Sequence, residues 1–316
     1  MTPTLRSITG QFPYWRKARM PAMLQDPTCS RVVIGCGSSY NLALSIAAAL
    51  NLKRFPAIAV PAGEWLIRPQ AYSAATGVEV IALSRSGETT ETVAAARASR
   101  GRGQWVTGIT CAPGSALATA SDECVAFDTH PDEGIVMTAS ASLMLLAGYA
   151  MAGESGFSTL ATRAETLMSA FAALPVGDLA NRSHFVFLGG GTNYGVALEG
   201  ALKLQEMALC YTQGFHPGEY RHGPVSLVDE RTAVVLLYSA ETAADEAVLA
   251  AELQAKGALV LGIGGPGTLS LPTATPGIGA GAEMLPLLQL LGERYAAAKG
   301  LDTSAPRHLT KVVILP

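Results

Sequence analysis

The sequence of 316 residues is poor in charge, in cysteine and in long hydrophobic runs. Charged residues make up only 15% of the chain and the formal net charge is −3, so we expect no basic surface of the kind that binds nucleic acid. The five cysteines are odd in number and scattered, without a C-x-x-C pair. This pattern argues against a disulfide framework and favours reduced thiols in the cytosol.

Targeting and membrane-spanning segments are also lacking. Residues 1–20 contain no continuous apolar segment like that of a signal peptide. The most apolar stretch, residues 141–153, is too short to span a bilayer. We therefore expect a cytoplasmic protein without a membrane partner. Because charge is sparse and alanine and glycine are abundant, we also expect closely packed helices and surface buried in an oligomer.

The chain contains an internal repeat at a constant offset of 154 residues. Residues 32–50, "VVIGCGSSYNLALSIAAAL", align with residues 186–204, "VFLGGGTNYGVALEGALKL", and keep two glycines and a tyrosine in register. The same offset carries residues 80–83, "VIAL", onto residues 234–237, "VVLL". A register kept over separated blocks indicates two copies of one unit.

Each copy alternates short apolar runs with helical patterns, which is typical of a parallel sheet covered on both faces. We predict an α/β protein with two tandem doubly wound parallel-sheet domains and helices on both faces. The expected strands lie near residues 31–35, 57–60, 78–84, 105–110, 184–189, 233–238 and 258–264. The expected parts are an N-terminal helical segment (1–30), a first domain (31–155), a second domain (156–298) that begins with a helix near 160–174, and a C-terminal tail (299–316).

Two turns of the first copy are rich in hydroxyl groups, "GCGSSYN" at residues 35–41 and "SRSGETTET" at residues 84–92. Such turns lie at the carboxyl ends of parallel strands, where helix N-termini favour phosphate. Ordinary helix capping is the alternative. The equivalent turn of the second copy, "YSAETAADE" at 238–246, needs a cap too but has fewer hydroxyls, so the excess favours an anion site. The residues expected to form this site are Gly37, Ser38, Ser39, Ser84, Arg85, Ser86 and Thr89.

The second copy carries acids and bases instead. Glu199, Lys203 and Glu206 are spaced i, i+4, i+7 and share one helix face. They form either a salt bridge on a solvated face or a buried cluster with a function. The alanine, glycine and leucine residues that flank them favour the buried cluster, because they indicate close helix packing. The loop that follows contains His216 and His222, which match no zinc pattern with a nearby cysteine, so we expect no metal.

Five motifs occur in the order "GCGSSYN", "SRSGETTET", "ALEGALKLQE", "GEYRHGP" and "LTKVVILP". Together they resemble the sugar isomerase (SIS) domains over residues 31–316. Within that family the chain resembles the isomerase half of glutamine–fructose-6-phosphate amidotransferase, the glucosamine-6-phosphate synthase, and its deaminase relatives that lack a glutaminase domain. The resemblance implies a phosphorylated hexose or hexosamine as substrate and no cofactor. It places the phosphate on Ser39, Ser84, Ser86 and Thr89 and on the backbone of Arg85.

The resemblance also implies catalytic roles. Glu206 moves the proton between C1 and C2, with Glu199 and Lys203 as its helix partners. His222 opens the sugar ring and is contributed by the neighbouring subunit, which implies a homodimer. Lys311 forms a Schiff base with the open-chain ketose, so the tail is expected to close over the site.

The sequence departs from the family pattern in three places. No glutaminase domain with its N-terminal cysteine precedes residue 31, the family's "GRG" is "GGG" at residues 189–191, and Ala139 stands where the family has a lysine. We therefore expect an isomerising deaminase that converts a hexosamine 6-phosphate to fructose 6-phosphate and ammonia. An aldose–ketose isomerase, an ammonia-dependent synthase and a non-catalytic phosphosugar sensor stay open as alternatives.

Overall fold

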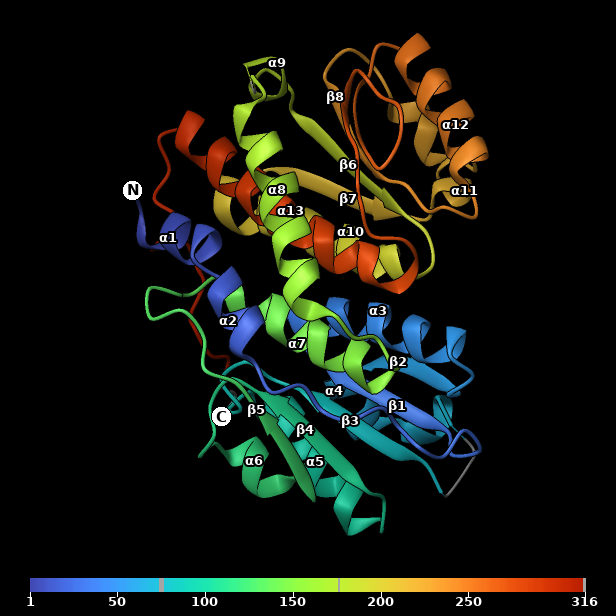
Figure 1. Cartoon of the computed structure of the whole chain (residues 1–316), viewed down its shortest axis with the longest axis vertical. Helices are drawn as coiled ribbons and strands as arrows, with labels where there is room; N and C mark the ends of the chain where they lie inside the picture. Colours follow the sequence, from blue (N-terminus) through green and yellow to red (C-terminus); the bar gives the residue numbers. More distant parts are fainter. Residues whose placement is uncertain (74–76, 176, 315–316) are drawn as a thin grey trace.

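The computed structural model describes residues 1–73, 77–175 and 177–314, which form two five-stranded parallel sheets (Figure 1). The first sheet has the order β2-β1-β3-β4-β5 and the second the order β7-β6-β8-β9-β10. Both sheets therefore repeat one doubly wound topology, and the predicted fold class is confirmed. The strands are β1 Arg31–Gly35, β2 Ala57–Pro61, β3 Glu79–Leu83, β4 Val106–Thr110, β5 Glu123–Ala126, β6 His184–Gly189, β7 Tyr211–Phe215, β8 Thr232–Leu237, β9 Leu259–Ile263 and β10 Leu269–Leu271.

All seven predicted strands are present, and three further strands, β5, β7 and β10, were not predicted. These three lie at sheet edges, where only one neighbour pairs with them and a continuous apolar run is not required. β7 reads "YTQGF" and most of its residues are partly exposed. It lies 154 residues after β2, so the repeat itself contained the signal for it.

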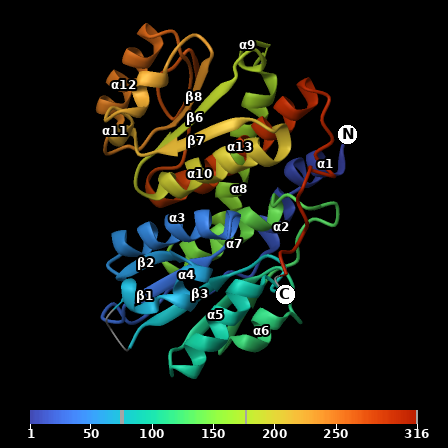
Figure 2. The same cartoon turned by 180° about the vertical axis from the view of Figure 1, so that it is seen from behind.

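A layer of helices lies between the two sheets (Figures 1 and 2). They bury the facing sides of both sheets in one shared apolar core, which contains Val33 and Ile81 from the first sheet and Phe185 and Val235 from the second. Each helix is rich in small residues, so the layer is thin enough to serve both sheets. The helices of this layer are α3 Ser38–Leu52, α7 Ala139–Met151, α10 Thr192–Ala208 and α13 Ala280–Ala298.

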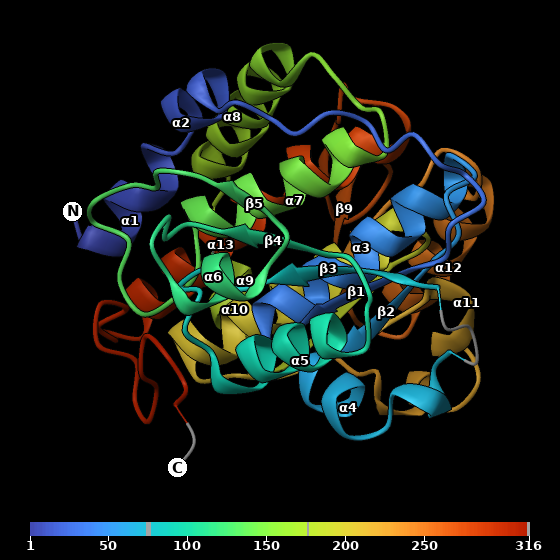
Figure 3. The same cartoon turned by 90° about the horizontal axis from the view of Figure 1, so that it is seen from below.

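The outer face of each sheet has a smaller apolar core of its own. Figure 3 shows α4 and α5 on one side of the first sheet and α7 on the other. The predicted connecting helix is present as α8, beginning three residues earlier than expected, and it packs on α13. Further helices are α4 Ala62–Ile67, α5 Thr90–Gly101, α6 Ala116–Ala120, α8 Phe157–Ala173, α9 Gly177–Ala180, α11 Pro217–Tyr220 and α12 Ala243–Ala255.

The two halves touch most closely where α3 crosses α10. A Cβ atom placed on Gly195 of α10 would lie 2.2 Å from the carbonyl oxygen of Asn41 and 2.5 Å from Oγ of Ser45, both on α3. Only glycine permits this approach, because any side chain at position 195 would overlap the backbone of α3. The crossing places the start of α3 beside the middle of α10.

The two ends of the chain cover the helix layer and the first sheet. Helices α1 Pro3–Thr9 and α2 Phe12–Lys17 pack against α13 and α8, and buried Gln11 donates from Nε2 to Oε1 of Gln289 at 2.9 Å. The tail returns from α13 to the first sheet, where the N–H of Thr90 donates to the carbonyl of Val313 at 3.4 Å. None of the helices in the described ranges is long and apolar enough to cross a membrane. The expected domain boundaries stay predictions.

Candidate active site

The first hydroxyl-rich turn connects β1 to α3. Gly37 precedes the helix with φ of +53°, a conformation that costs glycine little and most other residues more. Ser38 and Ser39 are the first two residues of α3, and both are buried. The turn therefore presents two serines and a helix N-terminus at the carboxyl edge of the first sheet.

The second turn connects β3 to α5 and lies next to the first, because β1 and β3 are neighbours in the sheet. Ser84 is buried beneath the turn, where its Oγ accepts the N–H of Gly87 at 3.1 Å and lies 3.2 Å from Oγ1 of Thr89. Oγ of Ser86 accepts the N–H of Glu88 at 3.2 Å. Ser84 thus shapes the turn, whereas Ser86 and Thr89 reach its surface.

A cavity of about 200 Å³ lies over the two turns. Glu206 of α10 and Lys311 of the tail line the same cavity, so it gathers residues from both halves of the chain and from the tail. Cys36 also lines it, and burial raises the pKa of that thiol, which keeps it neutral at physiological pH. The predicted anion-site residues on its wall are Gly37, Ser38, Ser39, Arg85, Ser86 and Thr89.

Glu199, Lys203 and Glu206 form a buried cluster on α10. Nζ of Lys203 lies 3.1 Å from Oε1 of Glu199 and 2.5 Å from Oε2 of Glu206. The side chains of Glu199 and Lys203 are 0% exposed and that of Glu206 is 19% exposed. The arrangement excludes a salt bridge on a solvated face, which was one of the two readings left open by the sequence.

Residues of α3 complete this cluster across the interface between the halves. Lys203 donates from Nζ to Oγ of Ser38 at 3.1 Å, and Asn41 donates from Nδ2 to Oε2 of Glu199 at 3.1 Å. The ammonium therefore connects the acid–base groups directly to the first hydroxyl-rich turn. Asn41 was not predicted as a site residue, although it lies in the "GCGSSYN" motif.

The charges of this cluster depend on one another. Burial by itself would lower the pKa of Lys203, but the carboxylates of Glu199 and Glu206 outweigh burial and raise it. Burial raises the pKa of Glu199, and Lys203 opposes that shift. One ammonium thus holds two carboxyl groups, of which Glu206 reaches the cavity. This arrangement suits a carboxylate that takes up and returns a proton.

The tail is fastened to the second turn by Arg85. Its guanidinium donates to the carbonyl of Lys311 at 2.8 Å and to the carbonyl of Gly134 at 3.0 Å. Nζ of Lys311 donates to the carbonyl of Glu133 at 3.3 Å. The side chain of Arg85 therefore binds the backbone of Gly134 and of the tail. The backbone of Arg85, which the resemblance assigned to the phosphate, belongs to the turn itself.

Glu133 organises the loop that receives these contacts, and sequence reasoning missed it. Its buried carboxylate accepts the N–H of Thr138 at 2.5 Å and the N–H and Oγ–H of Ser140 at 3.2 Å and 2.7 Å. Glu133 thereby caps the N-terminus of α7 and fixes the short segment between itself and the helix, residues 134–138. The sequence signal was an acid just ahead of a helix start in "DEGIVMTAS".

His222 lies outside this cavity. It is exposed, in the loop after α11, where its backbone N–H donates to the carbonyl of Glu219 at 3.0 Å. Its ring-opening role and its origin from a neighbouring subunit stay predictions. Ala139 is buried as the first residue of α7, and Gly190 and Gly191 line a different cavity.

The chain is similar to proteins of known class. A family model described as SIS domain matches residues 23–152 and 178–273. Curated relatives include glutamine–fructose-6-phosphate aminotransferases from Pyrobaculum aerophilum, 28% identical over 89% of this chain and 50% of that protein, and from Gloeobacter violaceus, 30% identical over 89% and 51%. The chain spans about half the length of these relatives.

Solved structures share the whole fold. A glucosamine-6-phosphate deaminase from Thermotoga maritima superimposes with a TM-score of 0.86 at 30% identity, covering 99% of this chain and 100% of that one. A tagatose-6-phosphate ketose/aldose isomerase from Escherichia coli superimposes with a TM-score of 0.77 at 24% identity, covering 99% and 90%. The second likeness concerns the fold alone.

We expect Lys203→Met to lower the free energy of unfolding by about 3–5 kcal/mol at pH 8, because it leaves two carboxylates without their buried counter-charge. The loss should shrink at pH 5. Burial raises the pKa of Glu199 in the folded state, so this carboxyl group binds a proton as the pH falls before the glutamates of the unfolded chain do, which titrate near 4.5. Urea denaturation at both pH values measures this, and exposed Lys256→Met is the control. An equal loss at both pH values would contradict the prediction.

We expect Arg85→Gln to release the tail, because it removes two hydrogen bonds from a charged donor. Trypsin should then cleave after Arg307 and Lys311 about fivefold faster or more, as mass spectrometry of brief digests would show. Arg97→Gln, which changes an exposed arginine on α5, is the matched control. Equal cleavage rates in a folded Arg85→Gln variant would mean that the guanidinium does not hold the tail.

Proposed function

The chain belongs to the SIS domain family, and we propose that it is an isomerising deaminase of a hexosamine 6-phosphate. The reaction would convert glucosamine 6-phosphate, or a close isomer, and water to fructose 6-phosphate and ammonia. Support comes from the whole-length match to a structure named glucosamine-6-phosphate deaminase, at 30% identity.

The observation that carries the proposal is that Glu206 shares one cavity with the hydroxyl-rich turns. A phosphate held by Ser39, Ser86 and Thr89 would fix one end of the substrate. Its binding energy would then position the reacting carbons at the other end. Ser84 would contribute indirectly, by holding Thr89 and the N–H of Gly87 in place.

The proposed chemistry is a proton transfer followed by hydrolysis. With the ring open, the Glu206 carboxylate would take the proton from C2 to give an enolamine and return it to C1, which leaves an imine at C2. Water adds to the imine carbon and ammonia departs, so the ketose phosphate remains. Lys203 would stabilise negative charge that develops during the transfer, because its ammonium is held protonated between two carboxyl groups.

Lys311 lies on the tail at the edge of the same cavity. An amine at this place could form a Schiff base with the ketose at C2, and the tail would exclude water while it stays fastened. We assign ring opening to His222 of a second copy of the chain, since the His222 of the same chain lies outside the cavity.

A plain aldose–ketose isomerase would use the same Glu206 carboxylate. A non-catalytic sensor would need no acid–base group at all. The buried cluster disfavours a sensor, because burying two carboxyl groups and an ammonium is costly and binding alone does not require them. Release of ammonia separates the deaminase from the isomerase.

We expect purified chain to release ammonia and fructose 6-phosphate in equal amounts from glucosamine 6-phosphate, measured by coupled assays. Glu206→Gln should reduce kcat by about 10²–10⁴, the usual contribution of a general base. Exposed Glu165→Gln serves as the control. Ketose formation from an aldose phosphate with no turnover of any hexosamine phosphate would favour the isomerase instead.

We expect Glu206→Gln and His222→Ala to be inactive separately and to complement each other when mixed from unfolded chains. In a random mixture half of the dimers are heterodimers, each with one intact site if His222 acts across the interface, so about one quarter of wild-type activity should return. Native chain refolded in the same way controls for recovery. If no activity returns, His222 does not act on the neighbouring site.

A further inference from the structure

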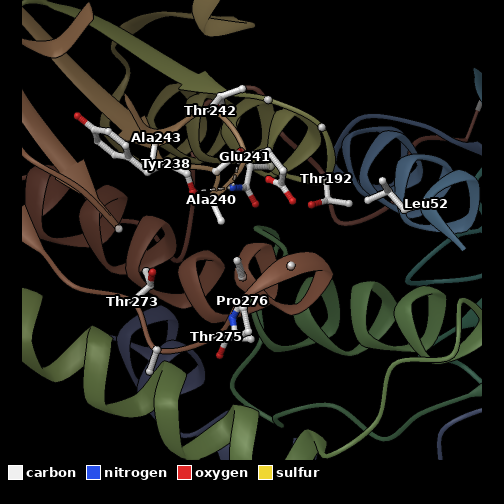
Figure 4. A pocket seen from close by; sticks show the side chains of 18 residues that line it. Leu52, Thr192, Tyr238, Ala240, Glu241, Thr242, Ala243, Thr273, Thr275 and Pro276 are labelled. Atoms are coloured by element: carbon white, nitrogen blue, oxygen red, sulfur yellow. Dashed lines mark hydrogen bonds between the residues drawn. The ribbon is translucent and has the colours of Figure 1, made fainter. Parts of the chain in front are cut away.

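A second cavity lies at the carboxyl edge of the second sheet and is larger than the first, at about 640 Å³. Its walls come from the turn between β6 and α10, the turn between β8 and α12, and the segment before α13. In a doubly wound sheet this edge is where ligands bind. Figure 4 shows Tyr238, Thr242, Glu241, Thr192 and Leu52 along one side and Thr273, Thr275 and Pro276 on the other.

This cavity is the repeat counterpart of the candidate catalytic cavity. The 154-residue offset carries the two turns that line the first cavity onto two turns that line the second. It also relates the residue that each cavity receives from the opposite half, Glu206 of α10 in the first and Leu52 of α3 in the second. The other pairs are Cys36 with Gly190, Gly37 with Gly191, Ser38 with Thr192, Ser39 with Asn193, Arg85 with Ser239, Ser86 with Ala240 and Thr89 with Ala243. Two copies of one pocket are therefore present.

The second cavity is unsuited to phosphate. Glu246, which is 2% exposed, accepts the N–H of Ser239 at 2.8 Å with one carboxylate oxygen and the hydroxyl of Thr242 at 2.9 Å with the other. The N–H that corresponds to Arg85 is thus already occupied by a carboxylate of the chain itself. Glu241, which stands where the first copy has Gly87, adds a second negative charge at the cavity and would repel an anion.

The same wall suits a cationic ligand with many hydroxyl groups. The carboxylate of Glu241 is exposed and makes no hydrogen bond or ion pair within the described ranges, so it can accept an ammonium. Thr192, Ser239 and Thr275 offer hydroxyl groups that both donate and accept. Leu52 supplies an apolar surface for the face of a sugar ring.

We propose that this second cavity binds an unphosphorylated amino sugar, with the ammonium on Glu241 and the ring hydroxyls on the threonine and serine side chains. The site is separate from the candidate catalytic cavity and contains none of its acid–base residues. Its occupation can therefore be measured by binding, whether or not the chain has the proposed deaminase activity.

The test is calorimetric titration of the full chain with glucosamine at neutral pH. We expect Glu241→Gln to weaken binding at least tenfold and Glu206→Gln to leave it unchanged. Glucose, which has a hydroxyl group in place of the ammonium, should bind at least tenfold more weakly than glucosamine. Glu123→Gln, on the exposed edge strand β5, is the matched control and should bind like the wild type.

Two results would overturn the proposal. One is the absence of binding to the wild-type chain at millimolar glucosamine. The other is binding that Glu206→Gln or Ser86→Ala abolishes while Glu241→Gln leaves it intact, which would place the sugar in the catalytic cavity. Because Glu241 is exposed, its substitution should not disturb folding, and thermal unfolding of each variant verifies this.

Discussion

The crossing of α3 and α10 at Gly195 is the constraint on which the candidate site depends. Backbone and side-chain atoms of α3 lie within 2.2–2.5 Å of where a Cβ at position 195 would stand, so the two halves approach as closely as the chain permits. That approach brings Ser38 within 3.1 Å of Lys203. A hydroxyl-rich turn from one copy and Glu206 from the other meet in one cavity because no side chain at position 195 separates these helices.

Duplication explains why the charges of α10 are not needed for the fold. The first copy has Ser45, Ala49 and Leu52 at the positions of Glu199, Lys203 and Glu206, and α3 packs in the same layer without them. The buried ions therefore cost stability that a neutral helix would not. The hydroxyl-rich turns diverged in the opposite way: in the second copy the carboxylate of Glu246 accepts the N–H of Ser239, which is the counterpart of Arg85.

Much of the fold could be predicted because strands buried on both faces require continuous apolar runs, which are visible in one sequence. The edge strands β5, β7 and β10 were not predicted because a strand with one neighbour needs no continuous apolar run. Within the site, the turns and the face shared by Glu199, Lys203 and Glu206 follow from local spacing. The contact of Arg85 with the tail and the role of Glu133 do not, because they join segments that only the packed chain brings together.

The sequence by itself determined the repeat, the doubly wound topology and the identity of the groups at each turn, since these depend on periodicity and on residues near one another in the chain. Only the tertiary structure decided that the cluster on α10 is buried rather than solvated, and that Glu206, Lys311 and the hydroxyl-rich turns share one cavity. The physical reason is that burial and distance between remote residues are set by how closely helices pack. One added methyl group at Gly195 would change the distance between α3 and α10, and no local pattern in the sequence predicts that distance.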